Sequence, residues 1–151
     1  MKRKIEKHIS RSVSETHSWA KKVLDFINLN KEHYTKKGKQ AAIILLDGIL
    51  GSGKTEFTKG FAKSLGIKDN VLSPTFLIMK KYDNLYHLDC YRLLPKPDKA
   101  LEELDLFEII NDSNNIVVFE WGDKLKLLKK YVKIKIHFDI CKNSRKIQIS
   151  Y

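Results

Sequence analysis

The stretch Gly48–Thr55 has the pattern Gly-x-x-x-x-Gly-Lys-Thr, and it constrains the fold more than any other part of the chain. The apolar run Ala41–Leu46 directly before it predicts a buried strand. The segment Glu56–Leu65 directly after it has apolar residues at helical spacing and predicts a helix, which Gly66 ends. A strand, a glycine-rich turn and a helix in this order are typical of the phosphate-binding P-loop. The sequence therefore predicts an α/β fold that is built around a nucleotide site.

The P-loop pattern has a mechanical reason. Its glycines let the backbone come close to a phosphate group, and the backbone N–H groups at the start of the helix point at the anion. Lys54 is expected to reach the β- and γ-phosphates, and Thr55 is expected to hold Mg²⁺. The alternative is a glycine-rich turn with a surface lysine, but the predicted strand and helix on either side favour the nucleotide site.

The length of the chain, 151 residues, suits one domain, and we expect a single domain over residues 1–151. The longest apolar runs are far too short to span a membrane, and the basic N-terminus has no apolar segment behind it, as a secretory signal would. Cys90 and Cys141 lack the spacing of metal ligands and are expected to be free thiols. These features together favour a cytoplasmic location.

The formal net charge of +11 is typical of proteins that have an acidic partner such as nucleic acid. The excess is nearly all lysine, however, and it is spread along the chain without aromatic residues clearly interleaved. Such a charge is more often a solvated surface than a recognition surface, so direct nucleic-acid binding is kept only as a weaker alternative.

Patterns of alternating and helical hydrophobicity predict the rest of the domain. Ser12 is expected to cap an amphipathic helix, and Glu15 is expected to reach back to the start of that helix. Strands are expected at 5–10, 76–82, 85–91, 116–119, 132–140 and 147–151, further helices at 98–110 and 123–128, and a loop at 28–40. Together they predict a three-layer P-loop NTPase-like domain whose mixed sheet has a parallel centre and antiparallel edge hairpins.

A P-loop nucleotidase needs a carboxylate beside Mg²⁺, at the carboxyl end of a central strand. Glu120 follows four apolar residues, and we assign it to Mg²⁺, directly or through water, together with Thr55. Asp89 shares one face of its predicted strand with His87 and Tyr91, and we assign it to orienting the attacking water or supporting the metal. These two roles could be exchanged. The alternative for Asp89 is an exposed hairpin face without chemistry.

Three further positions carry weaker signals. Ser73–Thr75 is a Ser-Pro-Thr turn that follows the P-loop helix, where other P-loop switch proteins present a hydroxyl group to the γ-phosphate and the metal. Arg92 either neutralises charge in the transition state or caps the hairpin. His87 is not expected to bind a metal, because no second His or Cys has suitable spacing.

Several motifs occur together in a distinctive order and spacing. They are the P-loop Gly48–Thr55, the turn Ser73–Thr75, the segment His87–Arg92 with the pattern His-x-Asp-x-Tyr-Arg, the segment Leu101–Leu104, and Phe119–Trp121. In this combination the chain resembles the TsaE (YjeE) family, the small ATPase of bacterial tRNA threonylcarbamoyladenosine synthesis, from about Ser14 to the C-terminus. It departs from the family's frequent pattern in Ile49 and Ser52, which replace Asp and Ala, and in the absence of a Gly after Leu104.

The resemblance implies a protein that binds ATP and Mg²⁺ and hydrolyses ATP slowly. It implies two partner proteins, TsaB and TsaD, and a contact with tRNA that is indirect, through the complex that these partners form. TsaD transfers the threonylcarbamoyl group, and the ATPase is needed for turnover of that complex. No membrane partner is implied.

The resemblance also assigns residues to the site. It gives Thr55 and Glu120 to Mg²⁺ and Asp89 to hydrolysis, and it places Glu15 and Thr16 of the N-terminal helix near the nucleotide. The residues expected to be catalytic are Lys54, Thr75, Asp89 and Glu120, and those expected to bind the nucleotide are Thr16, Gly48, Gly51, Ser52, Gly53, Lys54, Thr55, Glu56 and Ser73.

The main alternative function is that of a small-molecule or nucleoside kinase with a P-loop. A kinase needs an acceptor pocket and usually an arginine-bearing lid over the phosphates. This chain is short, has only four arginines and offers no obvious lid. A basic nucleic-acid-binding module with a vestigial P-loop is a third alternative, but it needs base-stacking aromatic residues on a basic face, and none is clearly placed in the sequence.

Overall fold

The structure is a computed structural model, and it describes residues 4–74, 78–91 and 104–151. Within these residues seven strands form one sheet, in the order β1-β7-β6-β2-β5-β4-β3. The strands are β1 (Ile5–Ser10), β2 (Ala42–Gly48), β3 (Met79–Tyr82), β4 (Leu85–Asp89), β5 (Ile116–Glu120), β6 (Ile134–Cys141) and β7 (Ser144–Ser150).

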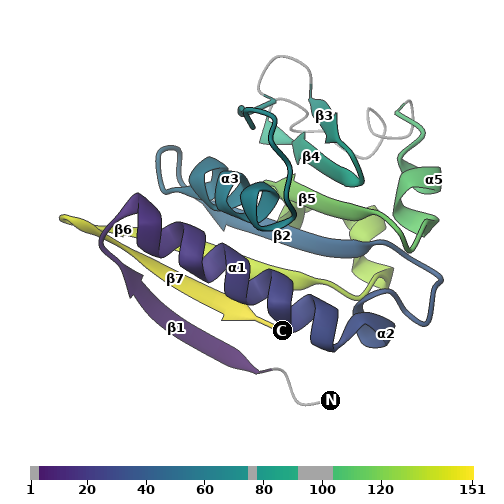
Figure 1. Ribbon diagram of the computed structural model, residues 1–151, viewed down its shortest axis with the longest axis horizontal. Coiled ribbons are helices and arrows are strands. Elements are labelled where there is room, and N and C mark those ends of the chain that lie inside the picture. Colours follow the sequence, from purple (N-terminus) through teal and green to yellow (C-terminus); the bar gives the residue numbers. More distant parts are fainter. Residues whose placement is uncertain (1–3, 75–77, 92–103) are drawn as a thin grey trace.

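The centre of the sheet is parallel and its edges are antiparallel. Strand β2 pairs in parallel with β5 and β6, and β5 pairs in parallel with β4. The pairs β1 with β7, β7 with β6, and β3 with β4 are antiparallel. The predicted mixed sheet is confirmed, and it brings the carboxyl ends of β2, β4 and β5 to one edge of the molecule (Figure 1).

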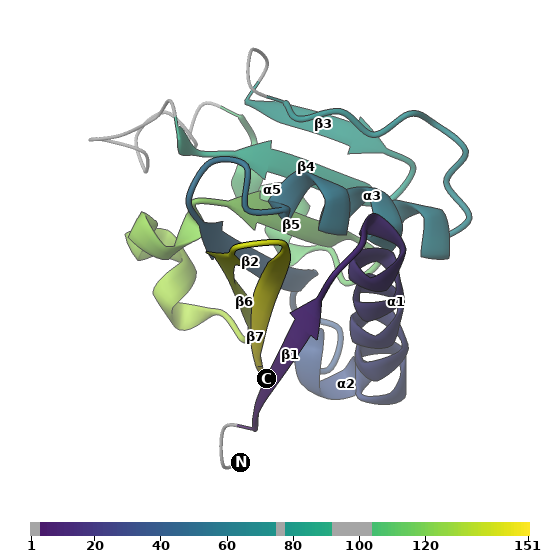
Figure 2. The ribbon, with the colours of Figure 1, turned by 90° about the vertical axis from the view of Figure 1, so that its left-hand side faces the viewer.

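Helices cover both faces of this sheet, which gives the predicted three layers. Helix α1 (Val13–Leu29) and helix α3 (Lys54–Ser64) lie on one face (Figure 1). Helix α5 (Leu106–Asn111) and the 3₁₀ helices η2 (Gly122–Lys124) and η3 (Lys126–Lys130) lie on the other face (Figure 2). No described helix has the length and apolar character that a membrane crossing requires.

Two hydrophobic clusters, one on each face, hold the layers together. In β5, Ile116 and Val118 belong to the cluster under α1 and α3, while Val117 and Phe119 belong to the cluster under α5 and η3. Because this strand is covered on both faces, its sequence is a continuous apolar run rather than an alternating one. Both cysteines are free, as predicted.

The start of α1 is fixed by hydrogen bonds that the sequence predicts. The Glu15 N–H donates to Ser12 Oγ at 3.1 Å, and Glu15 Oε2 accepts from the Arg11 N–H at 2.7 Å. The first of these bonds pairs an N–H group that the first turn of a helix otherwise leaves unsatisfied, and the second holds the chain just before the helix. They direct Thr16, which is only 5% exposed, toward the interior.

The predicted loop at 28–40 is wrong in part. Helix α1 continues to Leu29, and a short helix, α2 (Lys31–Tyr34), follows it. Tyr34 is 1% exposed, and its ring contacts that of Phe26 at 5.8 Å between centroids. One buried aromatic residue thus anchors a segment whose composition is otherwise polar. Because a single apolar residue makes no periodic pattern, hydrophobic periodicity did not predict helix α2.

Candidate nucleotide site

The P-loop lies between the end of β2 and the start of α3, as the sequence predicts. Gly48 has a φ angle of +143°, and a Cβ atom at this position would lie 2.5 Å from the Phe138 carbonyl oxygen. Gly53, directly before α3, has a φ angle of +110°. Glycine adopts such conformations at little cost, so these two residues allow the loop to turn over the start of α3. The first N–H groups of that helix, which lack partners within the helix, lie beside the loop and favour an anion there.

Lys54 extends into the loop and is only 4% exposed. Its Nζ donates to the carbonyl oxygens of Gly48 at 2.6 Å and Ile49 at 3.0 Å, and it lies 4.8 Å from the centre of the Trp121 ring. Burial lowers the pKa of Lys54, whereas nearby carboxylates, Glu120 foremost, oppose that shift. The loop therefore encloses a positive charge whose present partners are neutral oxygens.

Glu120, at the end of β5, is joined to residues from two other elements. Its Oε1 accepts a hydrogen bond from Thr55 Oγ1 at 3.2 Å and lies 2.9 Å from His87 Nε2. His87 is fully buried, and Glu120 is 3% exposed. A buried carboxylate with two partners at one oxygen is held in a fixed orientation.

Asp89 lies next to Glu120, because the two residues are paired in the register of β4 and β5. It is 8% exposed and accepts a hydrogen bond from the Tyr91 N–H at 3.0 Å. Burial raises the pKa of Asp89, the Tyr91 N–H lowers it, and the charge of Glu120 raises it further. The alternative of an exposed hairpin face is therefore wrong: β4 lies between β3 and β5, and its polar residues face the interior.

The oxygens present fit Mg²⁺. Thr55 Oγ1 and Glu120 Oε1 are 3.2 Å apart. Two neighbouring ligands of an octahedral Mg²⁺, each at roughly 2.1 Å from the metal, lie about 3 Å apart. Among the described residues, no group of three or more His, Cys, Asp or Glu side chains could hold a metal. Proteins commonly bind Mg²⁺ through one or two protein oxygens, with phosphates and waters completing the shell.

A cavity of about 370 Å³ brings most of the predicted site residues together. It is lined by Leu50, Gly51, Ser52, Gly53, Lys54, Thr55, Glu56, Ser73, Asp89, Tyr91 and Glu120. Ser52 Oγ is buried in this loop without a hydrogen-bond partner among the described residues, so a polar atom here is left for a ligand to satisfy. The predicted residues Thr75 and Arg92 lie outside the described residues.

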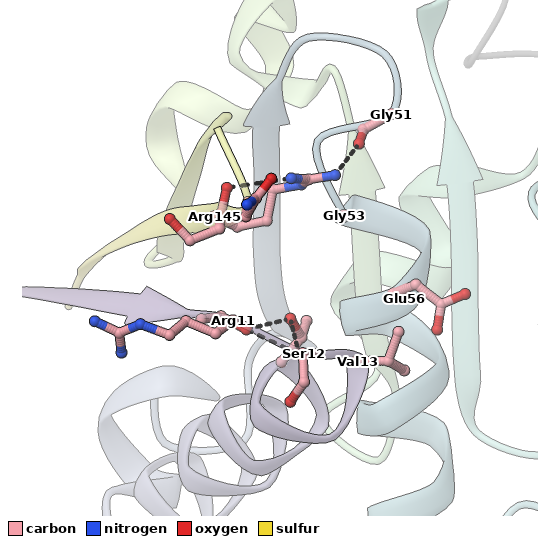
Figure 3. A pocket seen from close by; sticks show the side chains of 11 residues that line it. Arg11, Ser12, Val13, Gly51, Gly53, Glu56 and Arg145 are labelled. Carbon is pink, nitrogen blue, oxygen red and sulfur yellow. Dashed lines mark hydrogen bonds between the residues drawn. The ribbon is translucent and has the colours of Figure 1, made fainter. Parts of the chain in front are cut away.

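A second cavity, of about 330 Å³, borders the same loop (Figure 3). Gly51, Gly53 and Glu56 line both cavities, and Thr16 lines this one. Thr16 Oγ1 lies 2.8 Å from Ser10 Oγ, which fixes its position at the wall. The resemblance placed Glu15 here too, but its carboxylate is used on the Arg11 backbone and it does not line the cavity.

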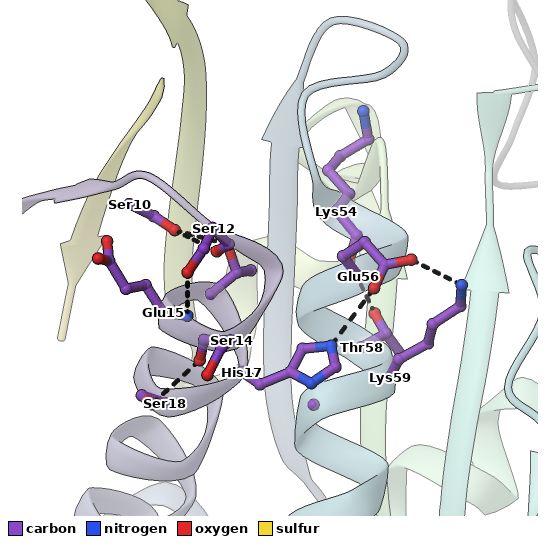
Figure 4. Close-up of polar contacts among 12 residues, drawn as sticks. Ser10, Ser12, Ser14, Glu15, His17, Ser18, Lys54, Glu56, Thr58 and Lys59 are labelled. Atoms are coloured by element: carbon purple, nitrogen blue, oxygen red, sulfur yellow. Dashed lines mark hydrogen bonds and ion pairs between the residues drawn. The ribbon is translucent and has the colours of Figure 1, made fainter. Parts of the chain in front are cut away.

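Glu56, which the sequence analysis predicts to bind the nucleotide, joins two helices through its carboxylate. It accepts from Lys59 Nζ at 2.6 Å and lies 3.3 Å from His17 Nε2 (Figure 4). The hydrogen bond from Lys59 is the main cause of its lowered pKa. The side chain of Glu56 thus links α3 to α1, and only its position next to the P-loop brings it to both cavities.

Sequence reasoning missed two residues of the site. His87 was recognised as unusual on its strand, but its contact with Glu120 depends on how β4 packs beside β5. Arg145, from β7, lies over the second cavity, where its Nη2 donates to the Gly51 carbonyl oxygen at 3.5 Å (Figure 3). Its only sequence signal is that it is one of four arginines and follows a turn between two strands.

Comparisons with known proteins identify the family. Residues 10–147 match the model of the family described as threonylcarbamoyl adenosine biosynthesis protein TsaE. The TsaE protein of Bacillus subtilis is 42% identical over 88 residues, which are 56% of this chain and 52% of that protein. The TsaE protein of Rickettsia typhi is 34% identical over 110 residues, 70% of this chain and 74% of that protein.

The lengths of these matches differ. The chain spans about half the length of the Bacillus, Nostoc and Streptomyces relatives, 52%, 54% and 57%, but 78% of the TsaE protein of Treponema pallidum, to which it is 32% identical. The crystal structure of YdiB from Bacillus subtilis superposes with a TM-score of 0.64 at 28% sequence identity, covering 99% of this chain and 87% of that chain.

The fold, the P-loop and the family match agree with one another. The match runs from the end of β1 to β7, so it includes both the P-loop and the strand that ends in Glu120. The chain therefore belongs to the TsaE family, whose proteins are involved in the biosynthesis of threonylcarbamoyladenosine in tRNA.

Proposed function

We propose that this chain binds ATP with Mg²⁺ at the P-loop and hydrolyses the ATP slowly, acting with the TsaB and TsaD proteins in threonylcarbamoyl modification of tRNA. The observation that carries the proposal is one cluster. Thr55, His87, Asp89 and Glu120 meet at the carboxyl ends of β4 and β5, beside the start of α3 and the buried charge of Lys54.

Lys54 and the start of α3 are proposed to bind the phosphates. The lysine now donates to two neutral carbonyl oxygens, and a charged phosphate oxygen is a stronger acceptor. The loop backbone around Gly51 and Gly53 supplies further N–H donors, and the second cavity, with Thr16 at its wall, leaves room for the nucleoside end.

Thr55 and Glu120 are proposed to hold Mg²⁺. When bound, the ion neutralises charge that develops on the phosphate oxygens. His87 supports this role indirectly, because its contact with Glu120 Oε1 orients the carboxylate.

Asp89 is proposed to orient the attacking water. A carboxylate with a raised pKa accepts a proton more readily near neutral pH than an ordinary one does. The Tyr91 N–H holds one oxygen of Asp89, and the cavity gives the carboxylate access to the place where the γ-phosphate would lie.

The deciding experiment is an ATPase assay on the chain alone and with the TsaB–TsaD pair. We expect slow release of free phosphate that requires Mg²⁺ and rises when both partners are present. The small-molecule kinase alternative makes the opposite prediction: phosphate would be transferred to a small acceptor and TsaB–TsaD would have no effect. That result would overturn the proposal.

A further inference from the structure

Three adjoining cavities open where α5 and η3 meet the segment after α2. Their volumes are about 430, 200 and 520 Å³, and Tyr131 lines all three. Phe107 and Lys130 line the first two, and Lys129 lines the first and the third. We call this region the lysine surface and define it by Lys36, Lys39, Phe107, Lys126, Lys129, Lys130 and Tyr131.

The positive charge of the lysine surface is not balanced by any carboxylate in the part of the chain that the structure describes. No described residue that lines the three cavities is Asp or Glu. None of its lysines forms an ion pair with a described carboxylate, whereas elsewhere Lys21 pairs with Asp25 and Lys59 with Glu56. Like charges that gather without partners create a positive potential, which attracts polyanions.

Aromatic side chains lie among these lysines. Phe107 is 64% exposed, so much of its ring is open to solvent. Lys130 Nζ lies 4.9 Å from the centre of the Phe107 ring and 5.2 Å from that of Tyr131. The sequence scatters these residues over three segments, and folding brings them together as the basic surface with interleaved aromatic residues that the sequence did not reveal.

The backbone that carries Lys36 and Lys39 is strained. Lys36 and Lys37 have φ angles of +48° and +53°, in the left-handed region. For residues other than glycine this conformation costs roughly 1 kcal/mol each. Strain of this kind persists where the surrounding structure requires a particular direction of the chain, and here it brings Lys36 and Lys39 to the rim of a cavity.

The lysine surface lies away from the P-loop. The Ile110 carbonyl oxygen, in α5, accepts from the Ala41 N–H directly before β2, whereas the P-loop follows the other end of β2. Seven residues of strand span roughly 20 Å. The lysine surface and the P-loop therefore lie at opposite ends of β2.

We propose that the lysine surface binds the phosphate backbone of RNA, so that the chain contacts tRNA directly. The affinity for RNA is inferred from the surface alone, and only the identity of the RNA as tRNA rests on the proposed function. An acidic segment of a partner protein is the competing occupant. RNA is favoured because exposed lysines from separate segments attract phosphates without regard to base sequence, and because an exposed phenyl ring offers a base a face to stack on.

The test measures the binding of fluorescently labelled tRNA to the full chain by anisotropy, over a range of salt concentrations. The double variant Lys129→Gln/Lys130→Gln is compared with Lys63→Gln/Lys68→Gln, which removes the same charge from exposed lysines near the end of α3. We expect about tenfold weaker binding for the first pair and a flatter salt dependence, by roughly one unit of slope per lost phosphate contact. The control pair should stay within about twofold of wild type.

A third variant tests the aromatic contribution. Phe107→Ala should weaken tRNA binding about fivefold while the salt slope stays unchanged, since stacking releases no counterions. Equal losses in both lysine pairs would show that only the overall charge matters and would overturn the proposal. Unchanged tRNA binding with weakened binding of Lys129→Gln/Lys130→Gln to TsaB–TsaD would also overturn it, and would assign the surface to a protein partner.

ATP hydrolysis by the same variants separates this inference from the proposed function. The lysine-surface variants should hydrolyse ATP at the wild-type rate, which also shows that they are folded. If neither the wild type nor any variant hydrolyses ATP, but the lysine-surface variants still bind tRNA more weakly than the control pair, then the proposed ATPase function is wrong and the proposed RNA-binding surface is supported.

Discussion

Charged side chains are buried and bonded at the P-loop end of the sheet, whereas on the lysine surface they are exposed and have no ion-pair partner among the described carboxylates. Lys54, Asp89 and Glu120 are 4%, 8% and 3% exposed, and each has hydrogen-bond partners at fixed distances. Lys129 and Lys130 are exposed, and neither pairs with a described carboxylate.

The difference indicates two kinds of recognition. A buried charge is costly unless its partners are fixed, so it is placed only where one geometry is needed, as at reacting groups. Exposed charges act over a distance, add up with little dependence on geometry, and are screened by salt. Single substitutions should therefore have large effects at the P-loop end, and several substitutions together should be needed for an effect on the lysine surface.

The largest effect is expected from Lys54→Ala. Loss of this charge removes the main cation of the loop, and ATP hydrolysis should fall about a thousandfold. Binding of tRNA should change by less than about twofold, because the lysine surface lies at the other end of β2. Phosphate release and tRNA anisotropy on the same sample check both parts. An equal loss of tRNA binding would show that the two regions do not act independently.

Glu120→Ala and Asp89→Ala test which carboxylate holds the metal. Each should lower hydrolysis about a hundredfold or more. Only Glu120→Ala should also weaken the Mg²⁺-dependent part of ATP affinity, since Glu120 is the carboxylate bonded to Thr55. Titration of ATP with and without Mg²⁺ measures this difference. If Asp89→Ala alone loses the Mg²⁺-dependent part, the two assignments are exchanged.

His87 is expected to have a smaller, indirect effect. His87→Leu removes the contact with Glu120 Oε1 and should raise the Mg²⁺ concentration needed for half-maximal hydrolysis about tenfold. His87→Gln places an N–H donor at a similar reach and should restore much of that loss. A purely structural role would lower the folded fraction in both variants and leave the Mg²⁺ dependence of the folded protein unchanged, which a thermal melt beside the assay would reveal.

The arrangement at the P-loop end of the molecule could be predicted because its signals are local. The P-loop is one uninterrupted motif, Glu120 follows an apolar run, and Asp89 shares one face of its predicted strand with two other polar residues. The contact between His87 and Glu120 was not predicted, because it depends on two strands lying side by side in one register. The pairing of strands far apart in sequence leaves no mark in the pattern of either strand alone.

The lysine surface could not be predicted for a related reason. Its residues come from 36–39, from Phe107 and from 126–131, and these segments meet only when α5 and η3 pack on the sheet. Lysines on three surface segments look the same in sequence as lysines spread over the whole molecule. Composition gave the net charge of +11, but only the fold shows where part of it gathers.

The smallest effect is expected at His137, which is partly exposed and pairs with two carboxylates. His137 Nδ1 lies 2.8 Å from Asp47 Oδ2 beside the P-loop, and Nε2 lies 3.0 Å from Asp139 Oδ1. Burial lowers the pKa of His137, but its hydrogen bonds to the two carboxylates outweigh burial and leave the pKa above its ordinary value of 6.5. The two ion pairs of His137 therefore stabilise the fold fully at pH values below 6.5. This stabilisation is lost as the pH rises through the raised pKa of His137.

His137→Asn should accordingly lower the free energy of unfolding at about pH 6 by only a few tenths of a kcal/mol, because the side chain is 44% exposed and solvent screens the pairs. The difference from wild type should shrink toward about pH 9, where the imidazole is neutral in both folded and unfolded chains. Urea unfolding at the two pH values measures it. Lys129→Gln, which breaks no pair with a described carboxylate, is the matched control and should show no difference that varies with pH. If His137→Asn lowers the free energy of unfolding equally at both pH values, the ring stabilises the fold through packing and not through its charge. The difference between bonded and unpaired charges would then hold only for the buried residues at the P-loop end.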